Sequence, residues 1–177
     1  MAEDNQPTYP KLVRDLMSVG VLTCSPDTSV VELTRGLLEK DLEGAVVLDD
    51  QGHAAGAVTR DDLVRAYAQG EYEALTAEQI MQDGVQQVPP DIPLTAAAQI
   101  MQDQGVRIVF LMHHAGGIEY PAAMLSYRHL LRHLAMEDTA DLHDMGIKAS
   151  REAPLESFFK RRDEARRQSE SDGGLTG

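Results

Sequence analysis

The chain has 177 residues and a formal net charge of −13 at pH 7. This charge argues against a nucleic-acid partner, because binding to phosphates requires clustered Lys and Arg, and no apolar run approaches the ~20 residues that span a bilayer. The single cysteine, Cys24, excludes an internal disulfide, and the polar segment 1–10 has no signal-peptide pattern, so we expect a cytoplasmic protein without membrane contact.

The first part of the chain predicts alternating helices and strands. We expect a helix over 11–17, a strand over 19–23, a helix after Ser29, a hairpin of strands 45–48 and 55–58, and a helix from Asp61 to about Gly70. Ser29 and Glu32 form a capping-box pattern at the start of the second helix. That helix is expected to bury an apolar stripe that consists of Val30, Leu33, Leu37 and Leu38.

The same order recurs after a linker over 71–76. The sequence predicts a capped helix after Thr76, a long helix from Pro93, strands over 108–111 and 121–125, and a closing helix over 127–135. The turn of the second hairpin is longer by three residues, which we assign to a Gly-rich loop over 113–117. Beyond 136, the segment 154–168 has a further helix pattern.

The two parts match as an internal repeat. Met17 to Asp27 and Met81 to Asp91 share Met, Gly, Val, Pro and Asp at an offset of 64 residues, and both copies reach a strand-to-helix turn, at Thr59 and at Ser126. A repeat of this length defines the architecture more firmly than any local pattern. Each unit of about 60 residues buries little surface alone, so we expect the two units to pack together.

The turn at Thr59 carries the residues with the most chemistry. Thr59 and Asp62 lie three residues apart at the expected start of a helix, so a hydroxyl, a carboxylate and free helix N–H groups converge there. Such an arrangement can hold a ribose and a phosphate. An ordinary helix cap is the alternative interpretation, because Thr and Asp are standard capping residues.

The repeat resembles a tandem CBS domain pair, also called a Bateman module. The residues that carry the resemblance are Met17-Ser18, Ser25 to Ser29, Gly44 to Asp49, Gly56-x-x-Thr59-x-x-Asp62, Ile80-Met81, Pro90-Asp91 and Ser126-Tyr127-Arg128. The resemblance implies an α/β fold of two β-α-β-β-α repeats, over 11–70 and 76–136, packed as a pseudo-twofold pair. After the repeats, the sequence pattern predicts a C-terminal helix and a disordered tail over 137–177.

The resemblance also implies a ligand site in a cleft between the repeats, where Thr59 holds a phosphate and Asp62 accepts hydrogen bonds from the ribose diol. The other implied contacts are Val21 and Ala45 beside an adenine, Ala57 at the ribose and Arg107 near the phosphate. AMP is the ligand we expect first, and ADP, ATP and S-adenosylmethionine are the alternatives. The acidic Glu43, at the position that matches Arg107, makes a triphosphate less favourable.

The second repeat departs from this pattern. Ser126 retains the hydroxyl, but His129 stands where the first repeat has Asp62. A neutral imidazole offers one acceptor rather than two oxygens. We therefore expect one ligand per chain, bound at the Thr59–Asp62 site.

The histidines suggest a metal site, but the pattern is incomplete. His113 and His114 are adjacent, and His129 and His133 are four residues apart, a spacing that can bind zinc on a helix. No Cys or acid completes a set at a known spacing, and no nucleophile–base motif is present, so we expect no metal and no catalysis.

Three functional hypotheses remain open. The first is a regulatory, non-enzymatic module that binds an adenosine ligand, and the second is a ligand-free scaffold that dimerises and presents its C-terminal helix to a protein partner. The third, an enzyme that uses the histidines with a metal, has the least support. We expect a homodimer because the helices carry surplus apolar residues, namely Leu63, Val64, Tyr67, Leu130, Leu131 and Leu134.

Overall fold

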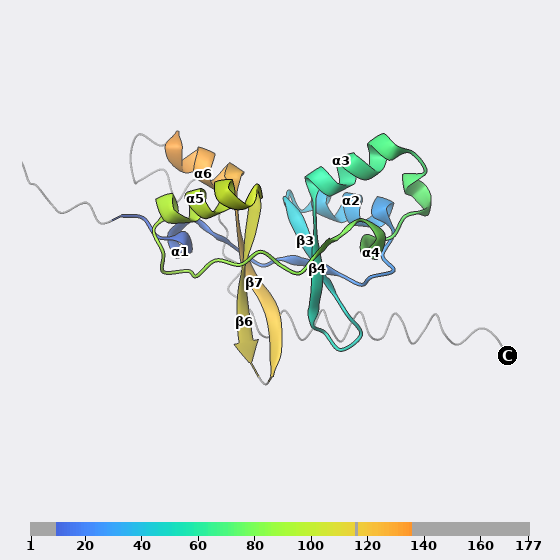
Figure 1. Cartoon of the computed structure of the whole chain (residues 1–177), viewed down its shortest axis with the longest axis horizontal. Coiled ribbons are helices and arrows are strands. Elements are labelled where there is room, and N and C mark those ends of the chain that lie inside the picture. Colours follow the sequence, from blue (N-terminus) through green and yellow to red (C-terminus); the bar gives the residue numbers. More distant parts are fainter. Residues whose placement is uncertain (1–9, 116, 136–177) are drawn as a thin grey trace, which may run out of the picture.

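The computed structural model describes residues 10–115 and 117–135, and it shows two α/β halves side by side (Figure 1). The first half of the chain contains α1 (Val13–Leu16), β1 (Ser18–Val19), β2 (Leu22–Cys24), α2 (Val30–Glu39), β3 (Gly44–Leu48), β4 (Ala54–Thr59), α3 (Arg60–Gln69) and η1 (Tyr72–Ala74). The second contains α4 (Ala77–Ile80), β5 (Gln82–Asp83), α5 (Leu94–Gln104), β6 (Ile108–Ala115), β7 (Ile118–Ser126) and α6 (Tyr127–Leu134). The α/β class and the two repeats are confirmed, whereas the expected tail helix lies outside the described residues.

Each repeat contributes its first strand to the sheet of the other repeat. One sheet has the order β1-β7-β6 and the other β2-β3-β4-β5. Strand β1 therefore pairs with β7 of the second repeat, through Ser18 and Met124, while β5 pairs with β4 of the first repeat, through Gln82 and Ala57. Neither sheet is complete without a strand from the other repeat.

The first helix of each repeat also packs against the other repeat. Val13 of α1 is buried among residues of α5, β6 and β7, and its N–H donates to the carbonyl of Ile92 at 3.0 Å. Ala77 of α4 is buried under α2, and its N–H donates to the carbonyl of Thr28 at 2.8 Å. The two repeats thus form one folded unit, as their small size requires.

An apolar cluster fills the interface between the two sheets. It consists of Val21, Val46, Ala57, Ile108, Phe110 and Met124, and partly buried residues such as Leu42 and Val85 pack around it. Val46 and Phe110 are at most 1% exposed. Burial of a side chain of this size contributes about 1.5–3 kcal/mol, so this cluster alone strongly favours the packed pair over separated repeats.

The expected strand over 19–23 is wrong, because the structure divides it into β1 and β2, in different sheets. Gly20 separates them with a φ of +91°, a conformation that glycine adopts without steric cost. The expected burial of Leu38 is also wrong, since this side chain is 66% exposed. Helix α2 buries only Val30, Leu33 and Leu37.

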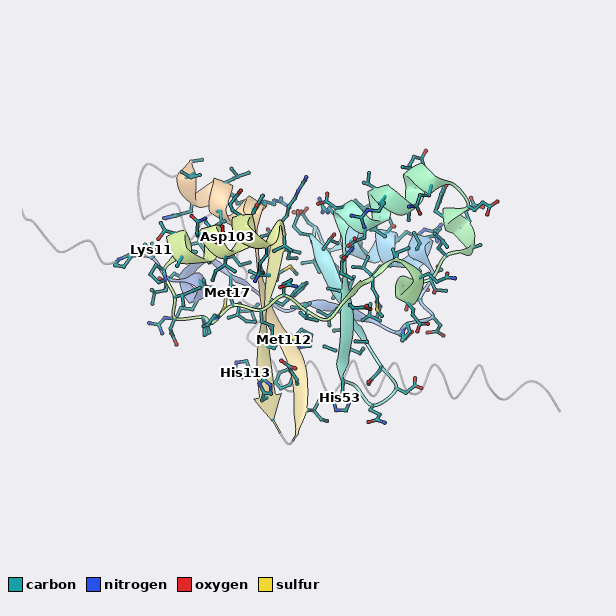
Figure 2. The ribbon with its side chains drawn as sticks, viewed as in Figure 1. Lys11, Met17, His53, Asp103, Met112 and His113 are labelled. Carbon is teal, nitrogen blue, oxygen red and sulfur yellow. The ribbon has the colours of Figure 1, made fainter. Side chains whose placement is uncertain are left out.

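The expected Gly-rich loop over 113–117 is largely strand. Strand β6 continues to Ala115, with His113 opposite Tyr120 and Ala115 opposite Ile118 of β7. The β6–β7 hairpin projects beyond the rest of its sheet, on the side away from α5 and α6, and His113 lies on this projecting part (Figure 2). In the described part of the chain, no helix has the length and apolar character needed to cross a membrane.

Candidate functional site

Thr59 and Asp62 form the N-terminal cap of α3. Thr59 is the N-cap residue in an extended conformation, and its hydroxyl accepts the Asp62 N–H at 3.4 Å. Asp62 Oδ2 accepts the Thr59 N–H at 2.8 Å in return, which completes a capping box. The sequence therefore brings the two predicted site residues together, in the arrangement expected of a helix cap.

Asp62 is 3% exposed and accepts four hydrogen bonds. Its Oδ2 accepts from the N–H and, at 2.7 Å, from the hydroxyl of Thr59. Its Oδ1 accepts from Arg65 Nη1 at 2.9 Å and from Gln82 Nε2 at 2.8 Å. A carboxylate has about four acceptor positions, so the protein itself occupies all of them.

The second repeat builds the same cap with a histidine. His129 Nδ1 lies 2.9 Å from the Ser126 nitrogen and His129 Nε2 lies 2.7 Å from Ser18 Oγ. Because a backbone N–H can only donate, Nδ1 is the acceptor, and in the neutral ring Nε2 then donates to Ser18. Burial lowers the pKa of His129 from 6.5 to about 4, and the charges of Arg132 and Arg128 act in the same direction.

The two caps receive matching contacts from the exchanged strands. Gln82, the first residue of β5, bonds Asp62, and Ser18, the first residue of β1, bonds His129. Ser18 and Gln82 are 64 residues apart, the offset of the repeat. Each cap is therefore linked to the other repeat by a side chain at an equivalent position.

Ion pairs link the repeats near the two caps, and in each pair the arginine belongs to the second repeat and the acid to the first. Arg107 Nε of the second repeat lies 3.1 Å from Asp61 Oδ2 on α3. Arg128 of α6 lies 2.6 Å from Asp41 and 3.8 Å from Glu43 of the first repeat, and its hydrogen bond holds the pKa of Asp41 below the usual range. The predicted phosphate contact Arg107 is therefore already paired with an acid.

The predicted adenine and ribose contacts lie on two faces of the first sheet. Val21 and Ala57 both belong to the cluster between the sheets. Ala45 is fully buried on the other face of β3, in the cluster with Leu33 and Leu37. Its neighbour Val46 faces the second repeat instead, so Ala45 can contact a ligand between the sheets only through its backbone.

Sequence reasoning missed Gln82 and Arg65 as partners of Asp62. Arg65 stands three residues after Asp62, a spacing that places both on one helix face, and this signal was available. Gln82 lies 20 residues after Asp62 in the chain, in a two-residue strand. Its contact depends on the exchange of β5 between sheets, for which no local pattern exists.

The two adjacent histidines of β6 have separate partners. His113 stacks on Tyr120 with ring centroids 5.8 Å apart, and His114 Nε2 lies 3.5 Å from Glu119. Within residues 10–115 and 117–135, no three His, Cys, Asp or Glu side chains gather where they could hold a metal ion.

Comparison with known proteins identifies the repeats. The sequence profile described as "CBS domain" matches residues 13–69 and 77–136. A 17.7 kDa protein of Acidianus ambivalens is 26% identical over 133 residues, which cover 75% of this chain and 76% of that protein.

Solved structures share the fold. A conserved protein from Pyrococcus horikoshii superposes with a TM-score of 0.62 and 22% identity, over 73% of this chain and 96% of that one. The CBS domain pair of protein MJ0100, solved in complex with 5′-methylthioadenosine and S-adenosyl-L-methionine, superposes with a TM-score of 0.60 and 22% identity, over 70% of this chain and 99% of that one.

Proposed function

The chain belongs to the CBS domain family, with two repeats in tandem, and from this premise we propose that it is a regulatory module without catalytic activity. The module binds an adenosine-containing ligand at the Thr59–Asp62 cap, between the repeats. The observation that carries the proposal is the position of Asp62, a buried carboxylate at a helix N-terminus that bonds a side chain of the other repeat. A ligand at this carboxylate contacts the junction of the two repeats directly.

AMP is the first candidate ligand. The MJ0100 pair, which has the same fold, was solved with two adenosine compounds, which supports the adenosine class. Arg107 has a 70% exposed side chain and pairs with Asp61, so a single phosphate group can replace the Asp61 carboxylate on it. Since Arg128 and Arg60 pair with Asp41 and Glu43, further phosphates would meet acidic side chains.

The ligand signals through the packing of the repeats. A ligand shifts an equilibrium only by its different affinity for two states. At this site, the two states differ in whether the second repeat contacts the α3 cap.

A thermal-shift series tests the proposal. The probes are AMP, ADP, ATP, S-adenosylmethionine and 5′-methylthioadenosine, with GMP as the control for the base. A ligand that binds only the folded state stabilises it by about 2.7 kcal/mol at 100 times its Kd. We expect a rise in Tm with AMP and none with GMP. If none of the adenosine compounds raises Tm at millimolar concentration, the proposed function is wrong.

A ligand-free scaffold is the second candidate, and the exposed apolar residues on two helices favour it. Val64 and Tyr67 of α3 and Leu131 and Leu134 of α6 are between 62% and 78% exposed, and they occupy matching positions of the two repeats. Such a matched pair of apolar faces suits a homodimer contact. Binding of AMP with no change in assembly would favour the first candidate, and assembly without any ligand response the second.

A further inference from the structure

Gln82 reaches Asp62 because its backbone is held against β4. Gln82 pairs with Ala57 in the sheet. At the adjacent Gly56, a Cβ would lie only 2.4 Å from the Gln82 carbonyl oxygen and 2.9 Å from Met81 Sδ. The absence of a side chain at Gly56 therefore lets β5 approach closely, which directs the Gln82 amide to Asp62 Oδ1 at 2.8 Å.

The four hydrogen bonds of Asp62 limit how a ligand can use this carboxylate. The two bonds to Oδ2 both come from Thr59 and belong to the helix cap. The two bonds to Oδ1 come from Arg65, whose side chain is 58% exposed, and from Gln82. A ribose hydroxyl that donates to Asp62 must therefore displace one of the donors on Oδ1.

Gln82 is the weaker of these two donors. Both donors bond the ionised carboxylate of Asp62, but only Arg65 adds the attraction between opposite charges, because the Gln82 amide carries no charge. Arg65 is also on the same helix as Asp62, only three residues away, so it stays near the carboxylate whatever the second repeat does. The Gln82 amide is therefore the donor that a ribose replaces at least cost.

Resting on the proposed function, we propose that Gln82 is an internal competitor of the ribose. Ligand binding at Asp62 displaces the Gln82 amide, and this displacement releases β5 of the second repeat from α3 of the first and loosens its pairing with β4. Gln82 then determines both the affinity of the site and its coupling to the packing of the repeats. The equivalent contact, Ser18 to His129, supplies a matched control at the other cap.

The test compares Gln82→Met, which keeps the length of the side chain and removes the amide, with Ser18→Ala. AMP and 2′,3′-dideoxy-AMP are titrated into the full chain by calorimetry. One displaced hydrogen bond to a carboxylate corresponds to a change of at least about tenfold in Kd. We expect Gln82→Met to bind AMP at least about tenfold more tightly, to bind the dideoxy compound as before, and Ser18→Ala to leave both affinities unchanged.

Amide hydrogen exchange gives a second readout that a purely structural role would not change. The Gly84 N–H, next to β5, donates to the Ala55 carbonyl at 3.0 Å. If β5 is released on binding, AMP accelerates exchange at Gly84 in the unmodified chain. If Gln82→Met does not fold, Gln82→Asn replaces it, because the shorter amide cannot span the present 2.8 Å contact.

The outcomes separate this inference from the proposed function. If AMP binds the unmodified chain and Asp62→Ala weakens it, but Gln82→Met binds no more tightly, the inference is overturned and the proposed function stands. Slower or unchanged exchange at Gly84 with AMP overturns it as well. If no adenosine compound binds either protein, both proposals fail.

Discussion

His129 and Ser18 join the two repeats through one hydrogen bond, in which His129 Nε2 lies 2.7 Å from Ser18 Oγ. The other ring nitrogen accepts the Ser126 N–H, so both ring nitrogens are hydrogen-bonded. The ring is also buried. A second proton on the ring would fall on Nδ1, where the Ser126 N–H already points. The cap of α6 is therefore compatible only with a neutral histidine.

This geometry predicts that stability falls as the pH drops below 6.5. The folded-state pKa of His129 is about 4, against an ordinary 6.5, so between these values the unfolded chain binds a proton that the folded chain does not. The stability that depends on a neutral His129 is fully present above pH 6.5, and about 2 kcal/mol of the unfolding free energy is lost by pH 5. Urea unfolding between pH 5 and pH 7.5 measures this loss.

His129→Gln is the matched control for the pH dependence. Its amide can accept from Ser126 and donate to Ser18, but it does not titrate. Because other groups titrate equally in both proteins, the difference between their unfolding free energies isolates His129. If the unfolding free energies of the two proteins fall in parallel as the pH drops, His129 does not cause the loss of stability.

Replacing Gly56 with Ala should destabilise the chain. The new Cβ would lie 2.4 Å from a backbone oxygen of β5, so the strand must move, and overpacking of this kind costs about 1–3 kcal/mol. Gly36→Ala in α2 is the control, since its Cβ would lie 3.3 Å from the end of the flexible Leu22 side chain and helix propensity favours Ala by up to about 1 kcal/mol. Thermal unfolding of both variants decides this, and equal Tm values would contradict the role of Gly56.

The apolar faces of α3 and α6 predict a homodimer in solution. Light scattering at tens of micromolar should give twice the 19.4 kDa chain mass. Tyr67→Glu and Leu134→Glu place a charge on the exposed faces, where these residues are 69% and 78% exposed, and each should shift the protein towards monomer. Thr95→Glu adds the same charge in the first turn of α5, a favourable place for an acid, and should leave the mass unchanged. A monomeric unmodified chain would contradict this prediction.

The sequence was sufficient to predict the repeats, the hairpins and the caps. The offset of 64 residues between Met17 and Met81 revealed the duplication, and the spacing of Thr59 and Asp62 predicted a helix start that the structure confirms. These features depend on local pattern or on comparison of one half with the other. Neither requires knowledge of how distant segments pair.

The exchange of strands could not be predicted in this way. Strands β1 and β5 have two residues each, too few for an alternating apolar pattern, and Ser18 pairs with Met124, more than 100 residues away. The side-chain partners of the caps follow from this exchange, so Gln82 was missed. Leu38 was misplaced because it lies beside the buried stripe of α2, next to Leu37, and faces solvent.

We expect the chain to bind one adenosine ligand at Asp62, and calorimetric titration of AMP measures the number of sites and their affinity. Charged hydrogen bonds contribute about 1.5–3 kcal/mol each, so Asp62→Ala should weaken binding at least tenfold, while His129→Ala should change little. Gln79→Ala removes the comparable cap acceptor of Thr76 on α4 and controls for the loss of a helix cap. We expect one site per chain that only Asp62→Ala weakens; two equal sites per chain, or unchanged affinity in Asp62→Ala, would show that the ligand site lies elsewhere.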